Sequence, residues 1–251
     1  MFPPLTSTQW CLALLAALSV GMAKSGFAGF GMVPVLLMAE IMPARESTGA
    51  VLPLLICGDI LAVATFRKHA QCRYIIRTLP PAVAGVAAGW WLMRTRGIPD
   101  RDFRAIIGGI VLALVGLQLF RKLKPALFAS VPHRAWIAWA AGSASGVTTM
   151  LANAAGPVMT LYLLAVGLPK WEFIGTAAFF FLVVNLIKIP FSLSLGLIDV
   201  HSLTLDALLF PAVAFGLVIG RKTMSVVLQK LFENIVLVFA ALAAARLFMA
   251  T

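Results

Sequence analysis

The chain has 251 residues, of which 61% are hydrophobic and 12% are charged, and its mean hydropathy is +1.00. Soluble domains carry about 25% charged residues, so this composition excludes a water-soluble globular fold. The formal net charge is +11. We attribute this charge to basic loops beside membrane segments and not to nucleic-acid binding, because no segment outside the membrane is long enough to form a binding domain.

The first apolar region is too long for one straight membrane helix. Residues 5–22 follow no basic segment, so they are predicted to be a retained membrane segment and not a cleaved signal peptide. The apolar region as a whole covers 9–42, which at ~1.5 Å per residue exceeds a ~30 Å hydrocarbon core. Residues that disfavour helix interrupt it at Gly21, Gly26, Gly29, Gly31 and Pro34. Two shorter helices joined by an irregular turn are therefore expected.

Six further segments have the length and composition of membrane helices, and one region repeats the broken pattern. The six segments are 47–66, 78–94, 103–120, 173–197, 204–220 and 230–249. The second broken region is 135–168, with Gly142, Gly146, Asn153, Gly156 and Pro157 inside it. The predicted fold is an all-α integral membrane protein with about 8 full spans or about 10 helical segments.

The two halves of the chain resemble each other. Pro81-Ala-Val-Ala has a counterpart in Pro211-Ala-Val-Ala, and a polar residue follows ten positions after a glycine in both halves, as Asp59 and Asn185. A duplication of this kind predicts two membrane repeats, residues 1–125 and 130–251, in one membrane domain.

The basic loop residues indicate how the repeats are oriented. If each broken region crosses the membrane once, alternate loops carry 9 and 9 Lys and Arg residues; if each enters and returns, the loops carry 12 and 6. The positive-inside rule favours the unequal distribution, and therefore two inverted repeats with both termini outside.

Polar residues at the two breaks form the candidate binding site. Helix N-termini exposed at such breaks suit an anion, and irregular backbone is tolerated at membrane depth where it lines a cavity. Lys24 adds a full charge inside an apolar region, where charged residues are usually functional. The predicted substrate-binding residues at the breaks are Lys24, Ser25, Gly26, Gly29, Thr148, Thr149 and Asn153.

Three further polar residues lie inside predicted spans. Asp59 is interpreted either as the ion-pair partner of Lys24 or the carrier of a coupling proton, or as a structural hydrogen-bond acceptor. Lys188 is interpreted as a second cationic ligand or a partner of Asp59, and Asn185 lies about one turn away on the same face. Asn185 and Lys188 complete the predicted substrate-binding set.

Enzymatic chemistry has no support in the sequence. The three histidines do not pair at metal-ligand spacing, and there is no P-loop, dinucleotide fingerprint or G-x-S-x-G motif. The three cysteines provide no disulfide framework. We therefore expect no catalytic residues, no metal and no cofactor.

The motifs also resemble a known family. Gly21-Met-Ala-Lys24-Ser-Gly26-Phe-Ala-Gly29-Phe-Gly31, then Pro34-Val-Leu-Leu, Leu52-Pro53-Leu, Asp59 and Pro80-Pro81-Ala-Val-Ala-Gly, resemble the sulfite exporter TauE/SafE family of membrane transporters. The resemblance covers nearly the whole chain and implies a duplicated architecture. It also implies a bacterial inner-membrane location and the transport of sulfite, sulfonates, thiosulfate or related organic anions.

The expected function is thus secondary transport of a small sulfur-containing anion across the cytoplasmic membrane. The expected partners are that anion and the lipid bilayer, and no nucleic acid. A coupling proton or Na⁺ and a homodimer are left open. The alternative is a non-transporting polytopic membrane protein, such as an assembly factor or an embedded enzyme.

Overall fold

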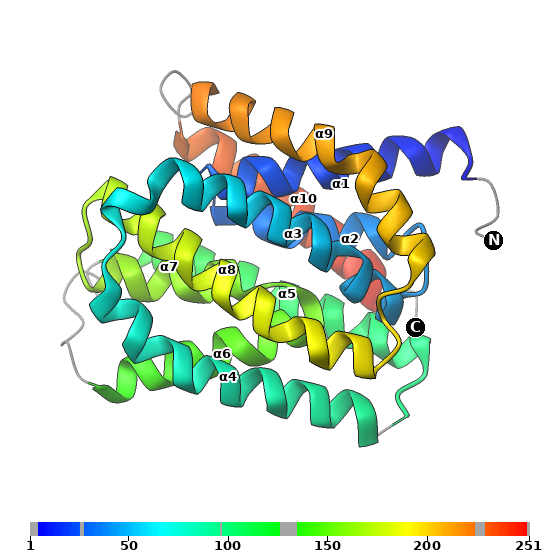
Figure 1. The fold of residues 1–251 in the computed structure, drawn as a ribbon, viewed down its shortest axis with the longest axis horizontal. Coiled ribbons are helices and arrows are strands. Elements are labelled where there is room, and N and C mark those ends of the chain that lie inside the picture. The colour runs from blue at the N-terminus through cyan, green and yellow to red at the C-terminus, as the bar shows by residue number, and fades with distance from the viewer. Residues whose placement is uncertain (1–4, 26–27, 96, 126–134, 224–228, 250–251) are drawn as a thin grey trace.

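The structure, a computed structural model, describes residues 5–25, 28–95, 97–125, 135–223 and 229–249. Within these ranges the regular elements are all helices (Figure 1). The elements are α1 (Ser7–Lys24), η1 (Ala28–Met32), α2 (Val33–Met38), α3 (Ala44–Phe66), η2 (Arg67–His69), α4 (Cys72–Thr95), α5 (Asp100–Leu123), α6 (Ala135–Ala152), α7 (Ala155–Ala165), α8 (Lys170–Ser194), α9 (Val200–Thr223) and α10 (Gln229–Met249). The prediction of an all-α fold is confirmed.

Four helical stretches of the described chain are long and apolar enough to cross a membrane. They are Ala44–His69, Asp100–Leu123, Lys170–Ser194 and Val200–Lys222, each with a mean hydropathy of 1.9 to 2.1. The predicted segments 78–94 and 230–249 fall in α4 and α10. The predicted span 173–197 is shifted, because α8 ends at Ser194 and Gly196 takes a positive φ of 67°. These helices make the protein a multi-pass membrane protein.

Each broken region enters the bundle and turns back. The chain leaves α1 at Lys24 and returns through η1 and α2, and it leaves α6 at Ala152 and returns through α7 (Figure 1). Asn153 ends α6 with φ 50°, a left-handed conformation that Asn tolerates better than most residues.

The glycines within α1 and α6 were wrongly expected to break the helices. Gly21 lies inside α1, and Gly142 and Gly146 lie inside α6. One glycine costs a helix only about 1 kcal/mol, which close packing offsets. A Cβ at Gly146 would lie 2.1 Å from the carbonyl oxygen of Ala82 in α4. These glycines therefore act as helix-packing positions.

The two halves pack as an inverted pair. Helix α4 lies along α6 and α9 lies along α1, while α3 contacts α8 and α5 contacts α10. The start of α3 meets the end of α8, where a Cβ at Gly49 would lie 2.1 Å from the backbone oxygen of Leu197. The start of α8 likewise meets the end of α3, where a Cβ at Gly175 would lie 2.7 Å from the backbone oxygen of Phe66. Corresponding helices of the two halves run in opposite directions (Figure 1). The division into 1–125 and 130–251 stays a prediction.

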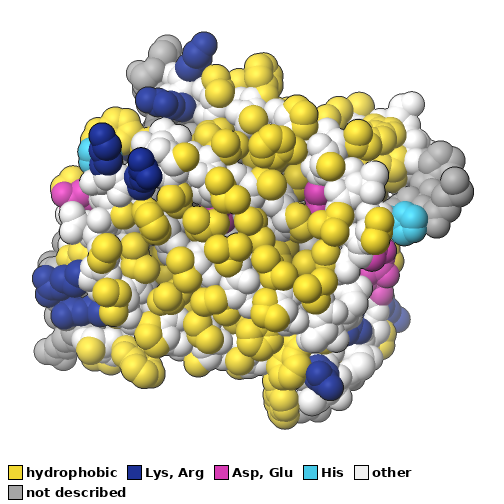
Figure 2. Space-filling view, in the orientation of Figure 1, with side chains coloured by type: hydrophobic (Ala, Val, Ile, Leu, Met, Phe, Trp, Pro, Cys, Tyr) yellow, Lys and Arg dark blue, Asp and Glu magenta, His cyan; other side chains and the backbone are white. Residues whose placement is uncertain are grey.

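Charged side chains gather at the two ends of the bundle and leave an apolar band between them (Figure 2). The end where α3, α5 and α9 finish carries most of the basic residues, namely Arg67, Lys68, Arg73, Arg77, Arg121, Lys122, Lys124, Lys170, Arg221 and Lys222. This arrangement agrees with the loop-charge argument for inverted repeats.

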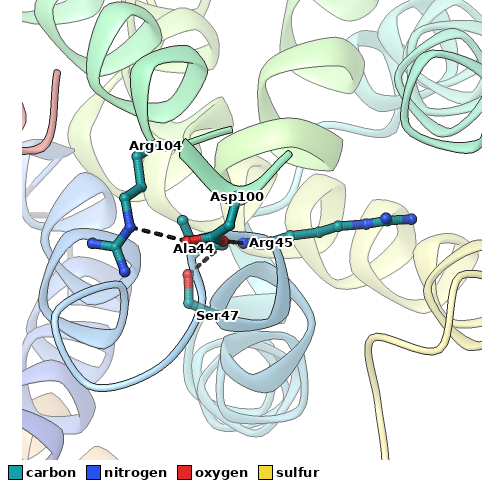
Figure 3. Close-up of polar contacts among 5 residues, drawn as sticks. All are labelled: Ala44, Arg45, Ser47, Asp100 and Arg104. Carbon is teal, nitrogen blue, oxygen red and sulfur yellow. Dashed lines mark hydrogen bonds and ion pairs between the residues drawn. The ribbon is translucent and has the colours of Figure 1, made fainter. Parts of the chain in front are cut away.

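Arginines at the opposite end have local partners. The carboxylate of Asp100 accepts one hydrogen bond from Nε of Arg104 at 3.0 Å and another from the backbone N–H of Arg45 at 3.3 Å (Figure 3). The second hydrogen bond also caps the start of α3. Arg246 pairs with Glu40 at 3.1 Å, and the guanidinium of Arg94 lies 5.2 Å from the Trp90 ring centroid. Arg104, Arg246 and Arg94 are thus each held by a neighbouring side chain.

Reporter fusions test the predicted orientation. Fusions after residues 70 and 124, which follow α3 and α5 at the strongly basic end, are expected to report the cytoplasm. Fusions after residues 98 and 197, at the other end, are expected to report the outside. Opposite compartments for the fusions after residues 98 and 197 would contradict the inverted arrangement, because they are expected if each broken region crosses the membrane only once.

Candidate functional site

A cavity lies where the two breaks meet α3 and α8. Its walls come from α1, η1, α2, α3, α6, α7 and α8. The volume of the cavity is about 70 Å³, well above the ~10–15 Å³ that one water needs. The cavity therefore has room for a small hydrated ion.

Four predicted site residues line this cavity: Lys24, Thr149, Asn153 and Asn185. Lys24 ends α1, Thr149 and Asn153 lie at the end of α6, and Asn185 belongs to α8. Both halves of the chain thus contribute polar groups to one space. The rest of the wall is mainly apolar, so these few groups determine how a ligand is oriented.

The charge of Lys24 is paired on the protein side. Its Nζ lies 2.6 Å from Oδ1 of Asp59, and the side-chain exposures of the two residues are 10% and 0%. The same Nζ lies 4.9 Å from the ring centroid of Phe181, a cation–π contact. Oδ2 of Asp59 accepts a hydrogen bond from Nδ2 of Asn185 at 2.7 Å. The two polar residues that correspond in the repeats therefore meet at the centre of the bundle.

Lys188 is fully buried one turn beyond Asn185. Its Nζ donates to the backbone oxygen of Thr149 at 2.8 Å and to Oδ1 of Asn153, with a longer contact of 3.3 Å to Oγ1 of Thr149. Nδ2 of Asn153 donates to the backbone oxygen of Thr48 at 2.8 Å. A cation at the C-terminus of a helix is favourable, so Lys188 stabilises the end of α6. Two roles were predicted for Lys188, as a ligand of the anion and as a partner of Asp59. In the structure Lys188 does not line the cavity and forms no ion pair with Asp59.

The N-terminus of α7 faces the cavity. Ala155 and Gly156, in its first turn, line the wall, and the N-cap residue Ala154 provides no side-chain hydrogen bond. The first N–H groups of a helix lack intrahelical partners and carry a partial positive charge. Together with Lys24 and the amide of Asn185, this turn offers donors to an anion.

Two hydroxyl groups predicted at the site form local hydrogen bonds instead. Oγ of Ser25 donates to the oxygen of Met22 at 2.7 Å, and a Cβ at Gly220 of α9 would lie 2.2 Å from that Oγ, so Ser25 is packed against α9. Oγ1 of Thr148 donates to the oxygen of Ala144 at 2.8 Å. Gly29 belongs to η1, and Gly26 lies outside the described residues.

Comparison with known proteins identifies the family. The family model described as "Sulfite exporter TauE/SafE" matches residues 12–247, nearly the whole chain. The chain belongs to this family. No curated protein and no solved structure matches it. The resemblance predicted from the Gly/Pro motifs is confirmed, and membership of the TauE/SafE family places the protein among transporters.

Two features of this TauE/SafE family member were not anticipated. Phe181 lies one helical turn before Asn185 on α8, so helical periodicity alone predicts that both face the same way. Asp206 in α9 is a buried carboxyl with 6% exposure, and neither of its oxygens has a hydrogen-bond partner among the described residues. The sequence could have indicated Asp206, because an ionisable residue inside an apolar span is usually functional. The described residues contain no group of three His, Cys, Asp or Glu side chains that could hold a metal ion.

Proposed function

We propose that the protein is a secondary transporter that moves a small sulfur-containing anion across the bacterial cytoplasmic membrane. The candidate anions are sulfite, a sulfonate, thiosulfate and related organic anions. The observation that carries the proposal is the cavity at the paired helix breaks, with Lys24 on its wall and donors from both halves.

The charges of the site support an anionic substrate. Lys24 and Lys188 each carry a formal positive charge, and Asp59 carries one negative charge, so the cluster is formally +1. A bound anion lowers this excess charge, which is costly in a low-dielectric interior. A cation in the cavity would raise it.

The inverted pair supports transport. Transporters with inverted repeats bind substrate at the repeat interface, between discontinuous helices. They open this site to one side of the membrane and then to the other by moving one element against another. Here the wall combines the end of α1 with the α6–α7 break. Relative movement of these elements would open the cavity to one side and then to the other.

Thermal unfolding of the purified protein tests the substrate class. Sulfite, thiosulfate, sulfoacetate and taurine are added separately, with chloride as the control salt. A ligand at about 100 times its Kd is expected to stabilise the folded protein by about 2.7 kcal/mol, which raises the melting temperature.

Flux into liposomes follows for each anion that stabilises the protein. Accumulation of that anion, absent from protein-free liposomes, is the expected result. Stabilisation by none of the four compounds, together with flat flux, would contradict the proposal and favour a non-transporting membrane protein.

A further inference from the structure

The Lys24–Asp59 ion pair has one member on the cavity wall and one behind it. Lys24 lines the cavity, whereas Asp59 is fully buried and does not belong to the wall. The contact between them, Nζ to Oδ1, is 2.6 Å. An anion that enters the cavity can therefore reach the ammonium group without reaching the carboxylate. Anion and carboxylate compete for the same cation.

Asp59 has little else to compensate its charge. Its second oxygen accepts one hydrogen bond from the neutral amide of Asn185. Lys188, the other cation of the cluster, donates to Thr149 and Asn153. Among the described residues, no second cation forms an ion pair with Asp59.

Among the described residues, no titratable group other than Lys24 forms a hydrogen bond or ion pair with Asp59. On α9, Asp206 lies near Cys57, and Cys57 precedes Asp59 by two residues on α3, so the two side chains point to opposite sides of that helix. On α5, Asp100 binds Arg104 and the backbone of Arg45 at the end of the bundle. The competition therefore concerns Lys24, Asp59 and the incoming anion, with Lys188 as a fixed charge nearby.

A buried carboxylate that loses its cation is an uncompensated charge in a low-dielectric interior, which strongly destabilises the protein. A proton removes this cost. With a divalent anion bound, the formal charges of the anion, Lys24, Lys188 and Asp59 sum to −1, and one added proton brings the sum to zero. We infer that Asp59 takes up one proton from solvent when an anion binds Lys24, so that anion and proton are bound together.

This inference rests on the proposed function and names its coupling ion. The proton adds to Oδ1 of Asp59 as the contact with Lys24 is released, and no covalent bond is broken. The resulting carboxylic acid is neutral and keeps its hydrogen bond with Asn185. The site is thereby neutral when loaded.

Titration calorimetry with thiosulfate and with sulfoacetate measures the uptake directly. Neither anion gains or loses a proton between about pH 6 and about pH 8. Any dependence of the measured binding enthalpy on the ionisation enthalpy of the buffer therefore reports the number of protons that the protein takes up. We expect uptake of about one proton per bound anion. Because binding takes up a proton, affinity rises as pH falls, by about tenfold per pH unit while Asp59 is charged in the free protein.

Two matched variants assign the proton. Asp59→Asn is expected to bind the anion without proton uptake and with an affinity that does not depend on pH. Asp206→Asn, which removes the other buried carboxyl, is expected to bind with uptake unchanged. The wild-type measurement stands by itself if the Asp59 variant does not fold.

Four results would overturn the inference. Binding by the wild type without proton uptake would remove it and leave the proposed function intact. Uptake that persists in Asp59→Asn, or vanishes in Asp206→Asn, would place the proton elsewhere. Absence of binding for both anions would remove the inference together with the proposed function.

Discussion

Lys24→Gln is expected to abolish anion binding and to destabilise the protein. The substitution removes the charged donor on the cavity wall and leaves the carboxylate of Asp59, which is 0% exposed, without its ion-pair partner. Breaking a buried pair by removing one partner typically costs about 3–5 kcal/mol. The melting temperature without ligand should therefore fall, and the stabilisation by the bound anion should disappear.

A double variant separates these two effects. Lys24→Gln combined with Asp59→Asn removes both charges, so most of the lost stability is expected to return. Anion binding is expected to stay absent, because the cation is still missing. Recovery of stability without recovery of binding is the pattern that distinguishes a ligand contact from a structural ion pair.

A surface lysine provides the matched control. Lys68→Gln makes the same chemical change at an exposed position in η2, remote from the cavity wall. Both its stability and its anion binding are expected to equal those of the wild type. Normal anion binding by the Lys24 variant, once its stability is restored by Asp59→Asn, would exclude Lys24 from the site.

The sequence predicts the charged centre because charge is costly in an apolar segment. Lys24 and Asp59 each stand inside such a segment, so each requires a partner, and pairing them is the simplest solution. The contact between Asp59 and Asn185 could not be predicted in the same way. It depends on the angle and register at which α3 crosses α8, and these are set by the packing of both helices.

Hydroxyl groups were the least predictable members of the site. Ser25 and Thr148 were expected at the ligand because they lie beside the breaks. In the structure each hydroxyl donates to a backbone oxygen of its own helix, from Met22 and Ala144 respectively. Ser and Thr satisfy themselves locally in this way, so an apolar surrounding does not force them toward a cavity. Lys188 differs because an ammonium group needs several acceptors, which the end of α6 supplies.

Close packing of the two halves depends on glycines, and Gly146→Ala tests it. In an exposed helix this change stabilises by up to about 1 kcal/mol. At Gly146 the added Cβ would lie 2.1 Å from the oxygen of Ala82, so α6 and α4 must separate. Overpacking of this kind costs about 1–3 kcal/mol, and a fall of several degrees in melting temperature is expected.

Gly21→Ala should have the same effect in the other half, because a Cβ there would lie 2.1 Å from the oxygen of Val213 in α9. Gly116→Ala in α5 is the control, since nothing lies within 4 Å of its Cβ position, and its melting temperature should be unchanged or higher. If Gly146→Ala and Gly21→Ala melt like Gly116→Ala, the contacts of α4 with α6 and of α1 with α9 are looser than described. Equal falls for Gly146→Ala and Gly21→Ala would instead show that the two interfaces bear comparable strain. That result is expected for contacts related by inversion, since each joins the first helix of one half to the fourth helix of the other.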